Sequence, residues 1–87
     1  MGVIILGGVV KQVKIHSTKR DNAQMAFVTI TDYISEIELV IFPSVFKKTS
    51  ELWKIDEVIL IKGKVQDKDG RSVVLIDKAI GLKRYVQ

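Results

Sequence analysis

The fold is decided by residues 36–53, which read EIELVIFPSVFKKTSELW. In the first part of this stretch apolar and polar residues alternate, and this period of two predicts a strand over residues 36–42. Pro43 ends the strand because its nitrogen has no hydrogen to donate to a sheet. From there to Trp53 the apolar residues recur at intervals of three and four, which predicts a helix over residues 44–53. The pattern therefore predicts a strand that runs directly into a short helix.

Strands are also predicted on both sides of this stretch. The five predicted strands cover residues 3–15, 25–31, 36–42, 58–66 and 72–78. Gly7-Gly8 interrupts the first strand and predicts a bend, and residues 67–70, which end in Asp-Gly, predict a tight turn before the last strand. This order is typical of an all-β, five-stranded Greek-key OB-fold barrel with one helix between strands 3 and 4. An SH3-like barrel is the nearest alternative, and the helix after the third strand favours the OB fold.

The composition limits the classes of protein to consider. A chain of 87 residues has room for one domain, which we expect over residues 1–82, with residues 83–87 as a frayed or truncated tail. Hydrophobic residues make up 47% of the chain and can form a core, while the absence of cysteine excludes disulfides and thiolate-bound zinc. No apolar run is long enough to span a membrane, so we expect a cytoplasmic protein with no membrane partner. The net charge of +4 favours a polyanionic partner.

Several motifs occur in the order found in one known family. They are LGGVV (residues 6–10), TKR (18–20), MAFVTI (25–30), IELVIFP (37–43) and IKGKV (61–65). With these motifs, residues 4–82 resemble the OB domain of bacterial replicative DNA polymerase III alpha subunits. The resemblance implies a non-catalytic module that holds single-stranded DNA beside the other domains of a replicative polymerase. The chain departs from the family at residues 21–24 and at Ser35, where the family usually carries a glycine.

Residues 27–32 also resemble the anticodon-binding OB domains of class II aminoacyl-tRNA synthetases, in which a phenylalanine on the second strand stacks on a base. RNA is therefore an alternative ligand. Strand alternation places Phe27, Thr29 and Thr31 on the outer face of this strand. We expect Phe27 to stack on a base and the two threonines to contact nucleic acid beside it. The alternative is that Phe27 packs under the first loop or the helix and closes one end of the barrel.

Positive charges gather at the two loops that OB folds use for nucleic acid. Phosphate contacts are expected from a group near the first loop and a group around the last hairpin: Lys11, Lys14, Lys19 and Arg20, then Lys62, Lys64, Lys68 and Arg71. His16 is a weaker candidate, and ion pairs of the second group with Asp67 and Asp69 are the competing interpretation. Glu36 and Glu38 repel phosphates, but Glu38 can accept a hydrogen bond from a base amino group or pair with a nearby lysine.

The sequence contains no recognisable catalytic centre. It has one histidine, no cysteine, no nucleophile motif and no phosphate-cradling glycine loop, so we expect neither enzymatic activity nor a cofactor or metal. Trp53 follows the helical spacing and is expected to plug one end of the barrel. A function of another class is protein docking, through an apolar patch of Val40, Phe42 and Phe46.

Overall fold

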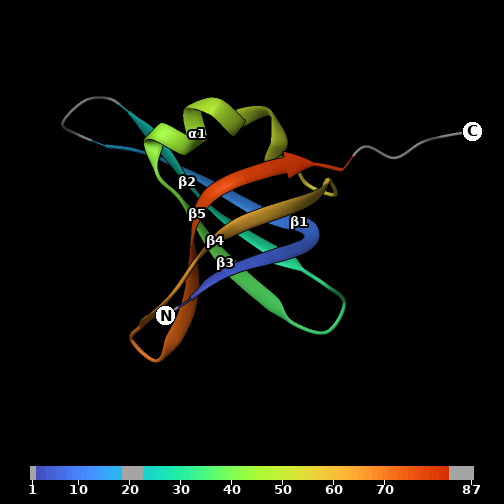
Figure 1. The fold of residues 1–87 in the computed structure, drawn as a ribbon. Coiled ribbons are helices and arrows are strands. Elements are labelled where there is room, and N and C mark those ends of the chain that lie inside the picture. The colour runs from blue at the N-terminus through green and yellow to red at the C-terminus, as the bar shows by residue number, and fades with distance from the viewer. Residues whose placement is uncertain (1, 19–22, 83–87) are drawn as a thin grey trace, which may run out of the picture.

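In the computed structural model, which describes residues 2–18 and 23–82, five strands close into a barrel in the order β1-β2-β3-β5-β4 (Figure 1). The strands are β1 (Val3–Ser17), β2 (Gln24–Thr31), β3 (Glu36–Ile41), β4 (Val58–Lys68) and β5 (Arg71–Gly81). Between β3 and β4 the chain forms helix α1 (Pro43–Thr49) and the 3₁₀ turn η1 (Ser50–Leu52). The predicted five-stranded barrel with a helix after the third strand is confirmed. Residues 83–87, predicted as a tail, lie outside the described residues.

The barrel closes through β1, which is 15 residues long and pairs with two different strands. Its first half pairs with β4, from Val3 to Val9, and its second half pairs with β2, from Val9 to Ser17. At the bend between the halves Gly8 lies close to β2: a Cβ at this position would lie 3.0 Å from the Thr31 carbonyl oxygen and 3.2 Å from a side-chain carbon of Ile30, which is tighter than most Cβ contacts. The bend predicted at the glycine pair is therefore confirmed.

A β-bulge follows the bend in β1. Val10 pairs with Ile30 and Gln12 pairs with Thr29, so Lys11 is the extra residue between two consecutive pairs. An extra residue reverses the inside-outside alternation of the strand. As a result, both Lys11 and Gln12 are exposed.

The core fills the barrel with aliphatic side chains and is closed at one end by the helical segment. Ala26, Val28 and Ile30 of β2 are at most 1% exposed, as strand alternation predicts. Trp53 is 5% exposed and belongs to the same cluster. Its indole Nε1 donates a hydrogen bond to the Thr49 hydroxyl at 2.9 Å, which satisfies the polar atom of the buried ring. The predicted role of Trp53 as a plug agrees with this position.

Some element bounds differ from the predicted ones. The α-helix ends at Thr49 and not at Trp53, because the chain tightens into η1 there. The last hairpin is longer than predicted: Lys68 pairs with Arg71, and Asp69-Gly70 alone forms the turn. Both turn residues have positive φ, 52° and 78°, which matches the twist of a two-residue hairpin.

Within the described part of the chain, no helix is long and apolar enough to cross a membrane.

The turn between β2 and β3 forms without the glycine that the resembled family carries. The Asp32 carboxylate accepts hydrogen bonds from the backbone N–H groups of Ile34 at 3.1 Å and Ser35 at 3.0 Å. The positive φ of the turn, 81°, falls on Tyr33. Since Ser35 is not among the residues with positive φ, this position needs no glycine, and the Asp32 carboxylate stabilises the turn through its hydrogen bonds. Tyr33 and Ile34 are held at the tip, almost fully exposed.

We predict that Gly63→Ala destabilises the barrel by about 1–3 kcal/mol, because the added Cβ would overlap the backbone carbonyl oxygen of Leu75 on β5. Chemical denaturation measures the change. Gly7→Ala is the matched control, since its Cβ would meet its nearest neighbours at an ordinary 3.6 Å. Equal stability of Gly63→Ala and wild type would show that β4 and β5 can separate at this point without cost.

We predict that the pKa of Asp32 lies below its ordinary value of 3.8, because the backbone N–H groups of Ser35 and Ile34 stabilise the carboxylate. A lowered pKa in the folded state means that the contribution of this carboxylate to stability is present above pH 3.8 and is lost as pH falls through the folded pKa. An NMR titration of the carboxyl carbon measures it. A titration at or above the ordinary value would contradict the hydrogen bonding. Asp32→Asn keeps the acceptor oxygen and removes the pH dependence of the turn.

Candidate nucleic-acid interface

Backbone pairing aligns two rows of outward residues across four strands. The first row runs from β1 through β2 and β3 to β5 as Lys14, Phe27, Val40 and Leu75. The second row lies beside it as Gln12, Thr29, Glu38 and Val73. Four of the predicted contacts, Lys14, Phe27, Thr29 and Glu38, are therefore neighbours on one face. The bulge at Lys11 is what turns Lys14 to this face.

Phe27 lies in the middle of the face and is half-buried. Its ring meets the imidazole of His16 edge to face, with centroids 5.6 Å apart and planes at 90°. This contact fixes the orientation of the phenyl ring from the β1 side. Phe27 also lines a pocket, so part of its side chain remains accessible. Its place on the outer face follows the predicted strand alternation.

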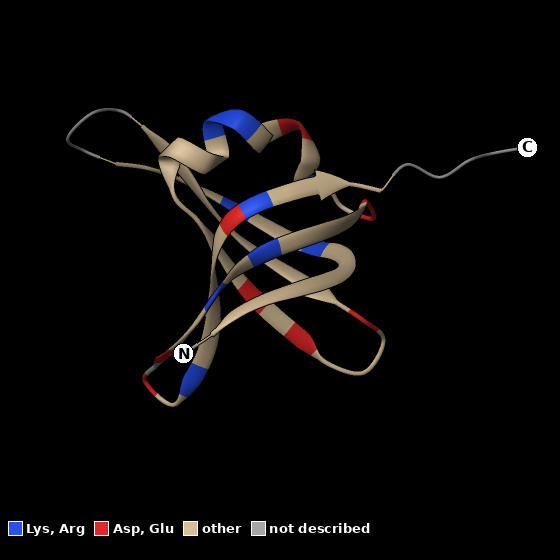
Figure 2. Cartoon of the chain, viewed as in Figure 1, with Lys and Arg blue, Asp and Glu red and all other residues tan. Residues whose placement is uncertain are grey.

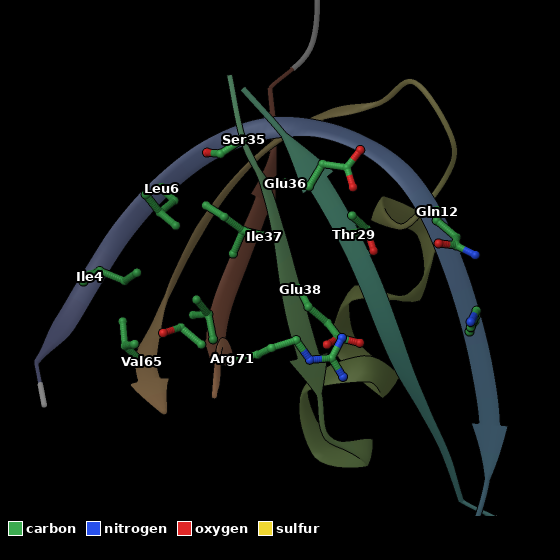
Figure 3. A pocket seen from close by; sticks show the side chains of 13 residues that line it. Ile4, Leu6, Gln12, Thr29, Ser35, Glu36, Ile37, Glu38, Val65 and Arg71 are labelled. Carbon is green, nitrogen blue, oxygen red and sulfur yellow. The ribbon is translucent and has the colours of Figure 1, made fainter. Parts of the chain in front are cut away.

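An open groove of about 710 Å³ crosses the face beside Phe27. Gln12 and Lys14 of β1, Thr29 of β2, Glu38 of β3 and Arg71 of β5 line it. In Figure 3 the side chains of Glu38 and Arg71 extend toward one another across the groove. The apolar wall consists of inward residues at the end of the barrel, among them Ile4, Leu6 and Ile37. The groove thus has cations on both sides and a polar, partly acidic middle.

A smaller pocket of about 210 Å³ adjoins the groove. It lies between Phe27 on β2, Glu38 and Val40 on β3, and Val73, Arg71 and Asp69 of the β4–β5 hairpin. Glu38 and Arg71 line both the pocket and the groove. The two hollows therefore adjoin one another, and together they are called the path over β2, β3 and β5.

Carboxylates and cations are interspersed on this side of the barrel, with acidic positions along β3 and at the β4–β5 turn (Figure 2). Lys11 is paired with Glu36 in an ion pair whose side chains are 59% and 52% exposed. Exposed pairs of this kind are weak, so the pair does not exclude a phosphate contact by Lys11. The hydroxyl of Thr31 donates to the Ser35 carbonyl oxygen and accepts from the Tyr33 N–H. Thr31 therefore supports the turn.

Two of the other predicted residues, Lys62 and Lys64, lie away from this face. Lys62 and Lys64 are exposed on β4, opposite Ile5 and Val3 of β1. β4 neighbours β1 and β5 in the closed barrel, so these two lysines are not part of the β2–β3 face. Lys19 and Arg20 lie outside the described residues, and Lys68 ends β4 with a side chain outside the described set.

Sequence reasoning missed Gln12, Asp69 and Val73, which line the path. Gln12 could not be assigned because a simple alternation from Val10 places it inside, and the bulge that reverses the alternation leaves no clear mark in the sequence. Val40 was expected on the outer face and lies there, but it is only 9% exposed, because Phe27 and Leu75 flank it on the neighbouring strands. Phe46 is 7% exposed, so the apolar docking patch predicted from Val40, Phe42 and Phe46 does not form.

Residues 4–80 match a family described as OB-fold nucleic acid binding domain, tRNA_anti-codon. Similar proteins are DNA polymerase III alpha subunits. That of Borreliella burgdorferi is 26% identical over 94% of this chain, that of Aquifex aeolicus 31% over 87%, and that of Staphylococcus aureus 33% over 75%. The chain spans 6–7% of the length of these relatives.

A solved structure has a similar fold. It is a replication protein A heterotrimer bound to single-stranded DNA, and it superposes with a TM-score of 0.76 at 12% identity, over 98% of this chain and 61% of the other. At this identity the match concerns the fold alone. Together with the family match over nearly the whole chain, it shows that the protein belongs to the OB-fold nucleic acid binding domains.

Proposed function

We propose that this domain grips single-stranded DNA along the path over β2, β3 and β5 and catalyses no reaction. The observation that carries the proposal is the placement of Lys14, Phe27 and Arg71 around two adjoining hollows on the outer side of the barrel, with Lys14 and Phe27 paired across β1 and β2. OB folds bind oligonucleotides on the faces of strands two and three and at the loops beside them. Membership in a family of nucleic acid binding domains supports the same ligand class.

The two parts of a nucleotide meet different groups on this path. A base stacks on the accessible side of Phe27, and such stacking is worth about 1–3 kcal/mol per base whatever the base. Phosphates lie near Lys14 on one side and Arg71 on the other, where neutralisation releases counterions. Glu36 and Glu38 oppose the phosphates and keep the affinity low, on the order of micromolar. The result is a sequence-tolerant and salt-sensitive grip.

The domain acts, in this proposal, as part of a DNA polymerase III alpha subunit in the cytoplasm and guides the template strand. The similarity to alpha subunits supports this role. The domain supplies binding and leaves phosphoryl transfer to other domains of the polymerase. Within the described residues, no group of three or more histidine, cysteine or acidic side chains is placed to hold a metal ion.

A second candidate function is docking against another domain of the same polymerase. An exposed apolar surface away from the groove favours it, because the side chains of Val3 and Ile5 on β1 and of Ile80 on β5 are 52–65% exposed. Ile5 and Ile80 line a groove together with Lys62 and Lys78. This exposed apolar surface is separate from the Phe27 face, so the two functions do not exclude one another.

We predict that Phe27→Ala weakens binding of a labelled single strand by about 1–3 kcal/mol, because the stacking platform is lost. Fluorescence anisotropy at low salt measures the affinity, and circular dichroism checks the fold. Phe42→Ala is the matched control, since Phe42 is 45% exposed and does not line the path. Labelled DNA and RNA strands of equal length separate the two ligands. If wild type binds neither at low salt, the proposal is wrong and docking becomes the better account.

We predict that the logarithm of the binding constant falls with the logarithm of salt concentration with a slope of roughly −3, for about four neutralised phosphates on a single strand. Lys14→Ala with Arg71→Ala removes two contacts and reduces the slope to roughly −1.5. Lys62→Ala with Lys64→Ala removes the same charge from β4, outside the path, and leaves the slope near its original value. An equal reduction in both double variants would contradict the assignment of the path.

A further inference from the structure

The exposed apolar surface carries positive charges among its aliphatic side chains. Strand pairing places Ile5 of β1 beside Lys62 of β4, and Lys62 beside Lys78 of β5. In the next row Leu60 of β4 lies beside Ile80 of β5. Figure 2 shows basic positions on both β4 and β5. An exposed apolar patch with charged residues around it is typical of a docking site for another protein.

The positive charges of this surface are not balanced within it. Lys62 and Lys78 are direct partners across the β4–β5 ladder, where like charges repel one another. Among the described residues, no ion pair joins either lysine to a carboxylate. Asp77, the extra residue at the bulge of β5, is exposed beside Lys78. A carboxylate brought to both lysines would offset their repulsion and form two attractions, so charge complementarity favours an acidic partner.

A groove of about 160 Å³ lies on the same surface. Ile5, Leu60 and Ile80 supply apolar side chains to it, and Lys62 and Lys78 supply cations. Its volume is well below the roughly 300–1,000 Å³ of pockets for drug-sized ligands, so it has room for a single side chain. One large apolar side chain with carboxylates beside it in the sequence matches both parts of this lining.

The way in which a partner can bind is limited by the pairing of β4. Over residues 58–64 this strand is paired with β1 on one side and with β5 on the other. A partner therefore cannot add a strand to β4, and it must bind through side chains.

Two other occupants match the surface less well. In a two-fold contact between two copies of this chain, the same lysines would enter the interface from both copies and repel one another. Nucleic acid would supply phosphates for the lysines, but its bases would find no stacking platform, because none of the described residues that line the groove is aromatic. An acidic segment with an apolar side chain satisfies both the charges and the groove.

We propose that the exposed apolar surface binds an acidic segment of another domain of the polymerase. One large apolar side chain of this segment fills the groove, and its carboxylates lie against Lys62 and Lys78. The inference rests on the docking function proposed above as the second candidate, and it adds the chemistry of the partner. Because the surface is separate from the Phe27 face, the domain can hold this segment and a single strand of DNA at the same time.

The test is an NMR titration of the isotope-labelled domain with a synthetic peptide in which a leucine is flanked on each side by three glutamates. The amide signals of Ile5, Lys62 and Ile80 are expected to shift. Lys78→Glu is expected to weaken binding about fivefold, because one exposed ion pair is replaced by a repulsion. Ile80→Ser is expected to weaken it roughly tenfold, because the groove loses apolar area that the leucine covers.

Lys54→Glu is the matched control, since it makes the same charge change at an exposed residue that does not line the groove. It is expected to keep the wild-type affinity, and an equal loss in Lys54→Glu and Lys78→Glu would overturn the proposal. A second peptide carries lysines in place of the glutamates. Equal or tighter binding of this basic peptide at the same amides would overturn the acidic partner and leave the docking function standing. Binding of neither peptide would overturn both, as would displacement of the acidic peptide from these amides by oligodeoxythymidine.

Discussion

The whole structure depends on one strand that pairs with two partners. β1 pairs with β4 before its bend and with β2 after it, and this double pairing is what closes the sheet into a barrel. The bend is possible because Gly8 lets the backbone approach Thr31 and Ile30 within contact distance. The bulge at Lys11 then resets the alternation for the rest of the strand. Without these two local features the outer face of β2 would have a different neighbour.

The candidate site follows from this geometry. Once the bulge turns Gln12 and Lys14 outward, they extend the rows of Thr29 and Phe27, and the short parallel pairing of β3 with β5 continues both rows to Val73 and Leu75. The result is one largely apolar row that starts at Lys14 beside a second, more polar row that contains Glu38. Because charges of both signs are mixed on this face, it attracts a polyanion less strongly than a uniformly basic face would.

Much of the fold could be predicted from the sequence because strands with one buried face carry a strong period of two. The alternation in β2 placed Phe27 and Thr29 correctly, and Pro43 marked the start of the helix. The sequence could not show how the strands close. Lys62 and Lys64 share a face of β4, as their spacing predicts, but strand order puts that face on another side of the barrel from Phe27. Gln12 was missed for a local reason, since a bulge is invisible to a count of alternate residues.

The length of the helix and the exposure of Val40 were harder to predict for a different reason. Both depend on neighbours that are distant in sequence. Trp53 leaves the helix yet stays in the core through its bond to Thr49, and Val40 points outward yet is covered because Phe27 and Leu75 lie on either side. Periodicity gives the direction of a side chain, whereas burial is set by the tertiary contacts around it.

The contact between β3 and β5 has a thermodynamic consequence. β3 and β5 pair in parallel through three residue pairs, Glu38–Val73, Leu39–Val74 and Val40–Leu75, and this contact is called the seam. The neighbouring antiparallel ladders, β2–β3 and β4–β5, are longer. The candidate pocket lies over this seam, with Phe27 and Glu38 on one side and Arg71 on the other. In the proposed complex a bound strand would contact both β3 and β5, so that binding and closure of this contact would favour each other by mass action. Amide exchange along β3 and β5 would then slow as the ligand concentration rises.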